Sequence, residues 1–330
     1  MQWILQVFFI LFIGLRMMGP DYPAYEEFYY TNESLKGTFE LFFRYTIKIF
    51  RSIPLPFHAY LVFIATLSVS IKLYVIRRYS PYFYLSLLFA FVNYLLADMG
   101  QIRFSLAIAT SWLALQYCEK EDFWRFATVC GIAATMHSSA WAFFPAYFIP
   151  SLRIKLPYML LIWVGCLAVS YLLDNSALSD WVNDNMLTKD SMISSKVTTY
   201  TSDEDQTFTT RVKFSVFGLL TKILQLVLFT YATMENERLK SFFINSYFVG
   251  GCLFFFFSFS EIMSVRLSMY YFSFEVLSIP CFMYYVRDKI TFWTLIGAFM
   301  VKLLYQFCTL IFVNTPMFYL PYKTILFPYW

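Results

Sequence analysis

The sequence is poor in charge and almost devoid of histidine. Of its 330 residues only 14% are charged and two are His, whereas 59% are hydrophobic and the mean hydropathy is +0.58. Soluble domains carry about a quarter charged residues, so this composition excludes a soluble enzyme, a disordered chain and a fibrous protein. Two histidines and no Cys-x-x-Cys pair also make a metal centre improbable, and we expect no metal and no other cofactor.

Nucleic-acid binding is also excluded. The net charge of +4 is distributed over short loops and forms no basic face. The six cysteines lie mostly inside apolar runs, where they are expected to be small core residues and not a disulfide framework. The chain has no Gly-rich phosphate loop and no internal repeat.

Long apolar runs dominate what is present. About 20 apolar residues cross a bilayer, and lipid requires every backbone group to be paired within the segment. The runs therefore predict an all-α polytopic membrane protein with about 10–11 transmembrane helices, forming one integral membrane domain over residues 1–330. No small-residue cleavage site follows the first run, so we expect a retained span. The runs fall at 1–18, 57–76, 81–97, 102–118, 123–136, 140–150, 156–173, 211–233, 241–260, 267–286 and 290–313.

Lys and Arg in the short loops predict the orientation, because cytoplasmic loops are enriched in them. With the N-terminus inside, the pairs Arg77 and Arg78, and Arg153 and Lys155, are cytoplasmic, and the acidic segment 174–210 becomes a periplasmic loop. This requires 123–150 to pass twice, or its second half to re-enter the membrane. The polar break at 136–139 favours that reading over one long helix.

Segment 38–53 has a different pattern. Glu40, Arg44, Lys48 and Arg51 recur along one helical face, and phenylalanines and isoleucines fill the rest. This pattern predicts a periplasmic amphipathic helix on the membrane surface, which either anchors a loop or places its basic stripe against lipid phosphates.

Chemically capable side chains collect at the outer ends of the predicted spans. A guanidinium binds phosphate oxygens in a bidentate manner, so interfacial arginines suggest a phosphate ligand. The alternative is that each arginine reaches out to lipid head groups, and a lone His is as readily structural as catalytic. Within the spans, Glu275 is expected to pair with Lys222 or Lys302. The outer residues are Arg16, Asp21, Tyr25, Gln101, Arg103, His137, Glu261, Arg266, Tyr270, Tyr322 and Lys323.

Together these motifs resemble the EpsG family, whose role is related to that of Wzy O-antigen polymerases. The order and placement of the motifs follow the family across nearly the whole chain. They are Gly14-Leu15-Arg16, Gly19-Pro20-Asp21-Tyr22 with Tyr25, Gln101-Ile102-Arg103 with Ala107, His137-Ser138-Ser139-Ala140, Arg266 before Tyr270-Tyr271-Phe272, and Pro321-Tyr322-Lys323.

The resemblance implies a polymerase in the bacterial inner membrane that acts on undecaprenyl-diphosphate-linked repeat units, with its active site facing the periplasm. Glycosyl transfer needs a base at the acceptor hydroxyl and positive charge at the leaving diphosphate. Asp21, His137 and Glu261 are the candidate bases, and Arg103 and Arg266 the candidate diphosphate ligands. The product is expected to be O-antigen, capsule or exopolysaccharide. Arg16, Tyr25, Gln101, Tyr270, Tyr322 and Lys323 are the further candidates for substrate binding.

The implied partners are the undecaprenyl-diphosphate-linked glycan, membrane lipids, a chain-length regulator and a flippase. Two other functions fit the same residues. A flippase of lipid-linked oligosaccharide would use similar arginines without chemistry, although flippases usually show paired halves and this chain shows no repeat. A membrane acyltransferase modifying the polysaccharide would use His137 as its catalytic residue.

Overall fold

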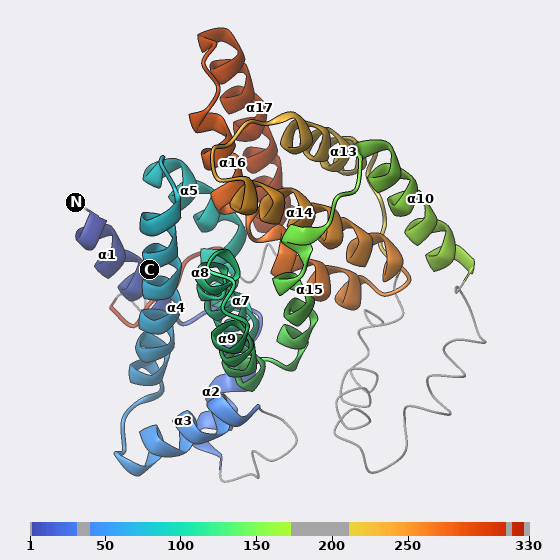
Figure 1. Ribbon diagram of the computed structural model, residues 1–330. Helices are drawn as coiled ribbons and strands as arrows, with labels where there is room; N and C mark the ends of the chain where they lie inside the picture. The colour runs from blue at the N-terminus through green and yellow to red at the C-terminus, as the bar shows by residue number, and fades with distance from the viewer. Residues whose placement is uncertain (1, 32–39, 173–210, 315–318, 327–330) are drawn as a thin grey trace. The chain divides into compact units, whose positions relative to one another are not determined.

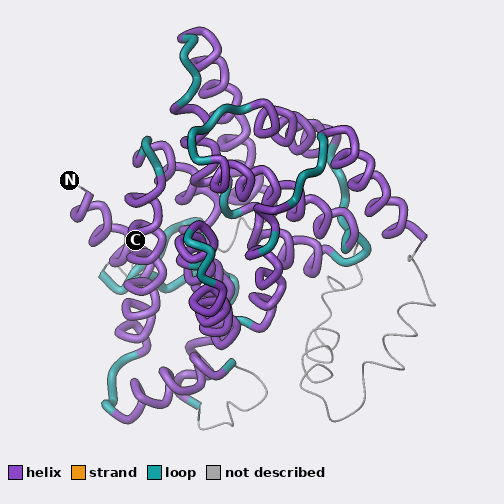
Figure 2. The backbone as a smooth tube through the Cα atoms, in the orientation of Figure 1, coloured by secondary structure: helices purple, strands orange, loops and turns teal. Residues whose placement is uncertain are grey.

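The computed structural model describes residues 2–31, 40–172, 211–314 and 319–326. These residues form helices joined by short loops, with no strand in the described ranges (Figure 2). This confirms the prediction of an all-α polytopic membrane protein. The predicted periplasmic loop at 174–210 lies outside the described residues.

Four helices in the described ranges are long and apolar enough to cross a membrane, and four shorter ones are also apolar. The prediction of 10–11 spans stays a prediction. The long helices are Phe57–Tyr79, Phe83–Gly100, Glu237–Phe256 and Lys289–Phe312, and the shorter ones are Gln2–Gly14, Phe123–Met136, Leu156–Leu172 and Val216–Tyr231.

The chain divides into two compact units. The first contains residues 1–35, 40–141 and 275–330, and the second contains 36–39 and 142–274. The elements of the first unit are α1 (Gln2–Gly14), α2 (Tyr22–Tyr30), α3 (Leu41–Ser52), α4 (Phe57–Tyr79), α5 (Phe83–Ala90), the π-helix η1 (Phe91–Leu95), α6 (Ala97–Gly100), α7 (Ile102–Leu113), α8 (Leu115–Glu119), α9 (Phe123–Met136), α16 (Glu275–Tyr284), α17 (Lys289–Cys308) and the π-helix η5 (Thr309–Asn314). The elements of the second unit are the 3-10 helix η3 (Ile149–Ser151), α10 (Leu156–Leu172), α13 (Val216–Tyr231), α14 (Glu237–Phe256) and α15 (Glu261–Phe272). The 3-10 helix η2 (Ser138–Tyr147) begins in the residue range of the first unit and ends in that of the second.

Helix α4 is the centre of the first unit, with α1, α5 and α7 packed against it (Figure 1). Its two ends differ in chemistry. At the end where α4 begins, Tyr22 lies 3.2 Å from His58 and Tyr29 donates to the carbonyl of Leu55. At the opposite end Arg77 donates to Gln6.

A buried ion pair joins α4 to the turn before α7. Lys72 lies 2.7 Å from Asp98, and their side chains are 0% and 3% exposed. Lys72 also donates to the carbonyl of Tyr94 and the hydroxyl of Ser105, and Ser68 donates to the second oxygen of Asp98. Tyr94 belongs to the π-helix η1, and π-bulges interrupt the regular helical bonding. Asp98 therefore has a structural role and ties this turn to α4.

Helix α3 confirms the predicted amphipathic helix, and its contact with lipid phosphates stays a prediction. Glu40 and Arg51 turn inward. Arg51 caps α2 by donating to the carbonyls of Phe28 and Tyr29. The residues it exposes at four-residue intervals are apolar: Leu41, Tyr45, Ile49 and Ile53. Of the charged stripe only Lys48 is exposed.

The structure confirms one predicted break and interrupts a run that was predicted to be continuous. The helix that begins at Phe123 ends at Met136, and 3-10 helices follow, which confirms the break at His137. Whether the second half crosses the membrane stays a prediction. The run 267–286 is interrupted between α15 and α16, where the buried Ser273 hydroxyl donates to the carbonyl of Tyr270. A serine that bonds its own backbone in this way weakens a helix.

Further along the chain, Lys302 on α17 lies 2.7 Å from Glu275 on α16. This confirms one of the two predicted pairings of Glu275. Lys222, the other predicted partner, instead lies over the rings of Phe254 and Phe272 in the second unit, at 4.4 and 4.2 Å from their centroids.

In the second unit α14 packs against α10, α13 and α15. The indole of Trp163 on α10 donates to the carbonyl of Phe248 and lies against Gly251. A Cβ at Gly251 would come within 2.2 Å of that ring, so only glycine allows this approach. Asn245 donates to the carbonyl of Ile149 and fixes the turn before α10.

Candidate functional site

The candidate site in the first unit is built around Arg103. Helix α7 begins at Ile102, so Arg103 stands in its first turn, as predicted. Its Nη1 donates to Glu40 Oε2 at 2.9 Å, and its Nε donates to the hydroxyl of Tyr25 at 2.5 Å. The guanidinium is 20% exposed and the carboxylate 6%. The loop before α3 and helix α2 thus hold Arg103 in one orientation.

Glu40 links Arg103 to the break that follows α9. Its second oxygen accepts the backbone N–H of Ser138 at 3.4 Å. His137 is the C-cap of α9, its Nδ1 lies 2.6 Å from the Ser139 hydroxyl, and its ring meets the edge of Phe104. The motifs around Arg103 and His137, which lie 34 positions apart in the sequence, therefore meet on one carboxylate.

Tyr25 is enclosed on α2. Burial raises the pKa of its phenol, with Arg103 lowering it and Asp21 raising it in turn. The phenol therefore stays protonated at neutral pH and orients the guanidinium as a neutral group. Asp21 precedes α2, is half-buried, and makes no side-chain cap to the helix.

Arg16 lies just beyond α1 and is 2% exposed. Its Nε donates to the carbonyls of Met18 and Met99, and its Nη1 donates to the carbonyl of Ile13. Gly19 permits this close approach, because its φ is +125° and a Cβ there would lie 2.2 Å from the Met99 oxygen. Arg16 thus fastens the loop after α1 to the turn that leads into α7.

The C-terminal segment pairs with the same loop. Met17 donates to the carbonyl of Lys323 and Ile325 donates to the carbonyl of Leu15, which gives an antiparallel bridge between Arg16 and Thr324. Two motifs from opposite ends of the chain therefore meet. Tyr319 lies beside them: burial raises the pKa of its phenol to about 12, with Arg16 lowering it and Asp21 raising it.

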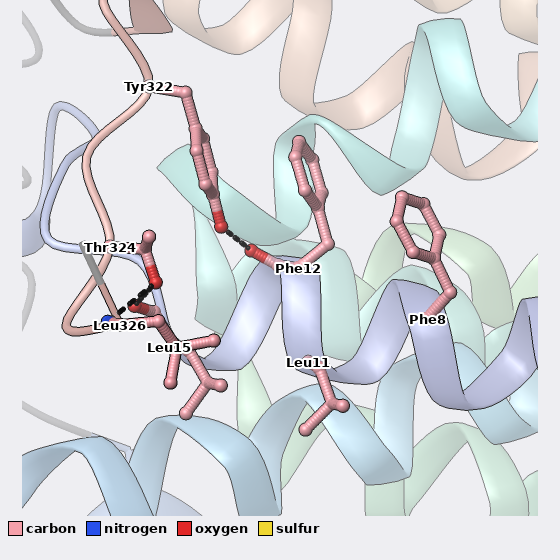
Figure 3. Close-up of a pocket in the computed structure, with 7 residues that line it drawn as sticks. All are labelled: Phe8, Leu11, Phe12, Leu15, Tyr322, Thr324 and Leu326. Atoms are coloured by element: carbon pink, nitrogen blue, oxygen red, sulfur yellow. Dashed lines mark hydrogen bonds between the residues drawn. The ribbon is translucent and has the colours of Figure 1, made fainter. Parts of the chain in front are cut away.

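A cavity of about 600 Å³ opens where these segments meet (Figure 3). Phe8, Leu11 and Phe12 on α1, with Leu15 just after it, form one wall. Tyr322, Thr324 and Leu326 form the opposite wall. The Tyr322 hydroxyl donates to the carbonyl of Phe12, and the two rings stack at 4.5 Å.

Three of the predicted site residues belong to the second unit. Glu261 is exposed in the first turn of α15, and Tyr270 is fully buried on the same helix. Arg266 is half-buried between them. The serines near it in the sequence bond backbone carbonyls: Ser264 donates to the carbonyl of Phe254 and Ser273 to that of Tyr270.

The first unit brings together Arg16, Asp21, Tyr25, Arg103, His137, Tyr322 and Lys323 at the end of α4 that begins at Phe57. Gln101 is the exposed N-cap of α7 at the same end. Sequence reasoning missed Glu40 as a site residue. The available signal was a carboxylate one residue before an amphipathic helix. Its inward direction could not be read without knowing that Arg103 lies opposite.

The described residues therefore define an all-helical membrane protein. Its first unit holds a cluster of arginine and carboxylate side chains at one end. Over residues 2–324 the chain matches the model of the EpsG family. The chain belongs to the EpsG family. It is a Wzy-type membrane protein of polysaccharide biosynthesis. No curated protein and no solved structure matches it.

Proposed function

We propose that this protein polymerises undecaprenyl-diphosphate-linked oligosaccharide repeat units at the periplasmic face of the inner membrane. The observation that carries the proposal is the family match over nearly the whole chain, together with the meeting of its dispersed motifs at one end of the first unit. In this reaction the growing glycan leaves its lipid diphosphate and bonds to a hydroxyl of a new lipid-linked unit.

Arg103 is the candidate ligand of the leaving diphosphate. Negative charge grows on that group as the glycosidic bond breaks, and a fixed guanidinium stabilises it without reorganising. Tyr25 and Glu40 hold the guanidinium in place. Arg266 lies in the second unit and stays a candidate from the family resemblance alone.

His137 is our first candidate for the base that accepts the proton of the acceptor hydroxyl. It stands at a helix end, is half-buried, and its Nδ1 is oriented by Ser139. Such an arrangement fixes which ring nitrogen faces a substrate. Asp21 is the second candidate, because it lies near Tyr25 and Tyr319 without capping its own helix. Glu261, exposed on α15, is the third.

Glycan chain length tests the proposal. Cells lacking the protein should display glycans of a single repeat unit, and a plasmid copy should restore the polymer. The purified protein should convert lipid-linked repeat units into longer lipid-linked glycan. Complete loss of surface glycan in the deletion strain would instead indicate a flippase. Polymer of normal length without acyl groups would indicate an acyltransferase.

A further inference from the structure

A buried ammonium group holds both sides of the turn that leads into α7. Lys72 Nζ donates to the carbonyl of Tyr94 at 3.0 Å, to Asp98 Oδ2 at 2.7 Å and to the Ser105 hydroxyl at 2.7 Å. An ammonium group has three protons, so these bonds use all of its donors. Helix α6 ends and α7 begins between Asp98 and Ser105. One side chain of α4 therefore fixes the start and the end of that turn.

Regular helical bonding fails on the way into this turn. The π-helix η1 contains Tyr94, and Gln101, which separates α6 from α7, is not helical. A π-helix and a non-helical residue so close together leave the backbone several paths, and π-bulges frequently lie at functional sites. The bonds from Lys72 hold the backbone in one of these paths.

Arg103 lies inside the segment that Lys72 holds. It stands in the first turn of α7, two positions before Ser105. Tyr25 and Glu40 hold its guanidinium from other elements. They can do so only where the backbone of α7 presents the side chain. Lys72 thus sets where the side chain of Arg103 starts, and its two polar partners set where it ends.

Stability alone does not account for the charges on Lys72 and Asp98. Their side chains are 0% and 3% exposed, and α4 is long and apolar enough to cross a membrane. Charges in that setting are costly, and replacing a buried pair by uncharged residues is often neutral or stabilising. What the charged pair adds to apolar packing is direction, because hydrogen bonds restrict both distance and angle.

We propose that Lys72 and Asp98 are positioning residues that place Arg103 in the candidate site. Both are too buried to touch a substrate, and they act through the backbone of the turn before α7. Their effect on catalysis rests on the proposed function, whereas the placement of Arg103 can be measured without any reaction.

Neutralising both partners separates positioning from stability. Lys72→Met combined with Asp98→Asn leaves no buried charge at this turn, so the protein should reach wild-type membrane levels. Lys72→Met alone leaves a buried carboxylate without its cation and should lower those levels. The matched control is Lys302→Met combined with Glu275→Gln. It neutralises a second ion pair of the first unit, 2.7 Å long, which joins α16 to α17.

A milder pair of variants avoids changes of charge. Ser105→Ala removes one of the three bonds of the Lys72 ammonium group. Ser111→Ala is its control, because Ser111 is equally buried on α7 but donates to the carbonyl of Ala107 in its own helix. Both variants should fold, since each removes a single hydroxyl group.

Modification of Arg103 by phenylglyoxal reports its placement directly. The guanidinium is 20% exposed and bonded to Tyr25 and Glu40, so it should react slowly in the full wild-type chain in nanodiscs. We expect mass spectrometry to show a rate about tenfold higher in the neutralised Lys72 pair, as for loss of one charge-assisted hydrogen bond. Ser105→Ala should raise the rate less, and both controls should leave it unchanged. A wild-type rate in the neutralised pair and in Ser105→Ala would overturn the proposal.

Turnover of lipid-linked repeat unit tests the consequence for the reaction. The neutralised Lys72 pair should lose about ten- to a hundredfold in kcat, because misplacement by ~1 Å can cost about a hundredfold. KM and the melting temperature should change little. In an Arg103→Lys background the same change should add little further loss, whereas a fully independent loss would show that the pair acts elsewhere.

The two measurements separate this proposal from the proposed function. Faster modification of Arg103 with normal turnover would overturn the positioning role in catalysis. If the wild-type protein forms no polymer, the polymerase is refuted, and the modification rates still decide whether Lys72 places Arg103.

Discussion

At the residue scale, Arg103 is the side chain whose geometry matters most. It holds a hydroxyl and a carboxylate at once, through two different nitrogens of one planar group. Lysine has a single nitrogen and cannot reproduce a fork. An arginine that merely reached the lipid head groups would tolerate lysine, because only its charge would matter.

We therefore predict that Arg103→Lys slows polymerisation by roughly ten- to over a hundredfold, since a charge-assisted hydrogen bond contributes ~1.5–3 kcal/mol. Turnover of purified lipid-linked repeat unit, at equal protein levels, is the measurement. Arg125→Lys is the control, because Arg125 is 71% exposed and pairs within its own helix turn. Wild-type turnover of Arg103→Lys would remove Arg103 from the site.

Glu40 should act through Arg103 and not independently. Glu40→Gln keeps the size of the side chain but removes the charge facing the guanidinium, so we expect turnover to fall about tenfold. Combined with Arg103→Lys it should cause little further loss, because both changes remove the same interaction. Fully additive losses in this double-mutant cycle would show that Glu40 has a separate task.

At the element scale, glycine contacts decide how closely helices approach. Gly251 on α14 faces the indole of Trp163 on α10, whereas a Cβ at Gly165 on α10 would meet no atom within 4 Å. Gly251→Ala should lower the free energy of unfolding by about 1–3 kcal/mol through overpacking. Gly165→Ala should be neutral or slightly stabilising, because alanine favours helices.

Thermal unfolding of the two variants in detergent measures this difference. Equal melting temperatures for Gly251→Ala and Gly165→Ala would mean that α10 and α14 do not pack as closely as described. Trp163→Phe should restore part of the loss in Gly251→Ala, since the six-membered ring alone leaves more room.

Sequence pattern predicted these elements unevenly. Apolar runs marked α4 and α9 well, because a span must satisfy its backbone within one continuous helix. Helix α2, Tyr22–Tyr30, was not predicted, since nine residues mixing tyrosines and glutamates show no clear period. Lys72 and Asp98 were visible as charges, but their pairing depends on how α4 packs against the turn before α7. For the same reason Arg103 could be identified as a candidate, but its carboxylate partner could not.

At the scale of the whole molecule, the first unit has two chemically different ends. Lys48 belongs to the end that holds Arg103 and Glu40, and Arg125 stands at the start of α9, whose other end reaches His137. The enrichment of basic residues in cytoplasmic loops predicts that Lys48 faces the periplasm and Arg125 the cytoplasm.

Single cysteines at these two positions, in a protein lacking its six native cysteines, test the orientation. An impermeant thiol reagent added to intact spheroplasts should label Lys48→Cys and leave Arg125→Cys unlabelled until the membrane is opened. The reverse pattern would place the candidate site in the cytoplasm and refute a periplasmic polymerase.

The pairing of residues 15–17 with residues 323–325 also has a consequence for biogenesis. Helix α1 leaves the ribosome early, but the strand-like partner of its following loop is made 309 positions later. During synthesis the backbone of residues 15–17 therefore lacks these hydrogen-bond partners until the later helices have been made. The cavity beside α1 is complete only after residue 326 has been made, because Tyr322, Thr324 and Leu326 form one of its walls.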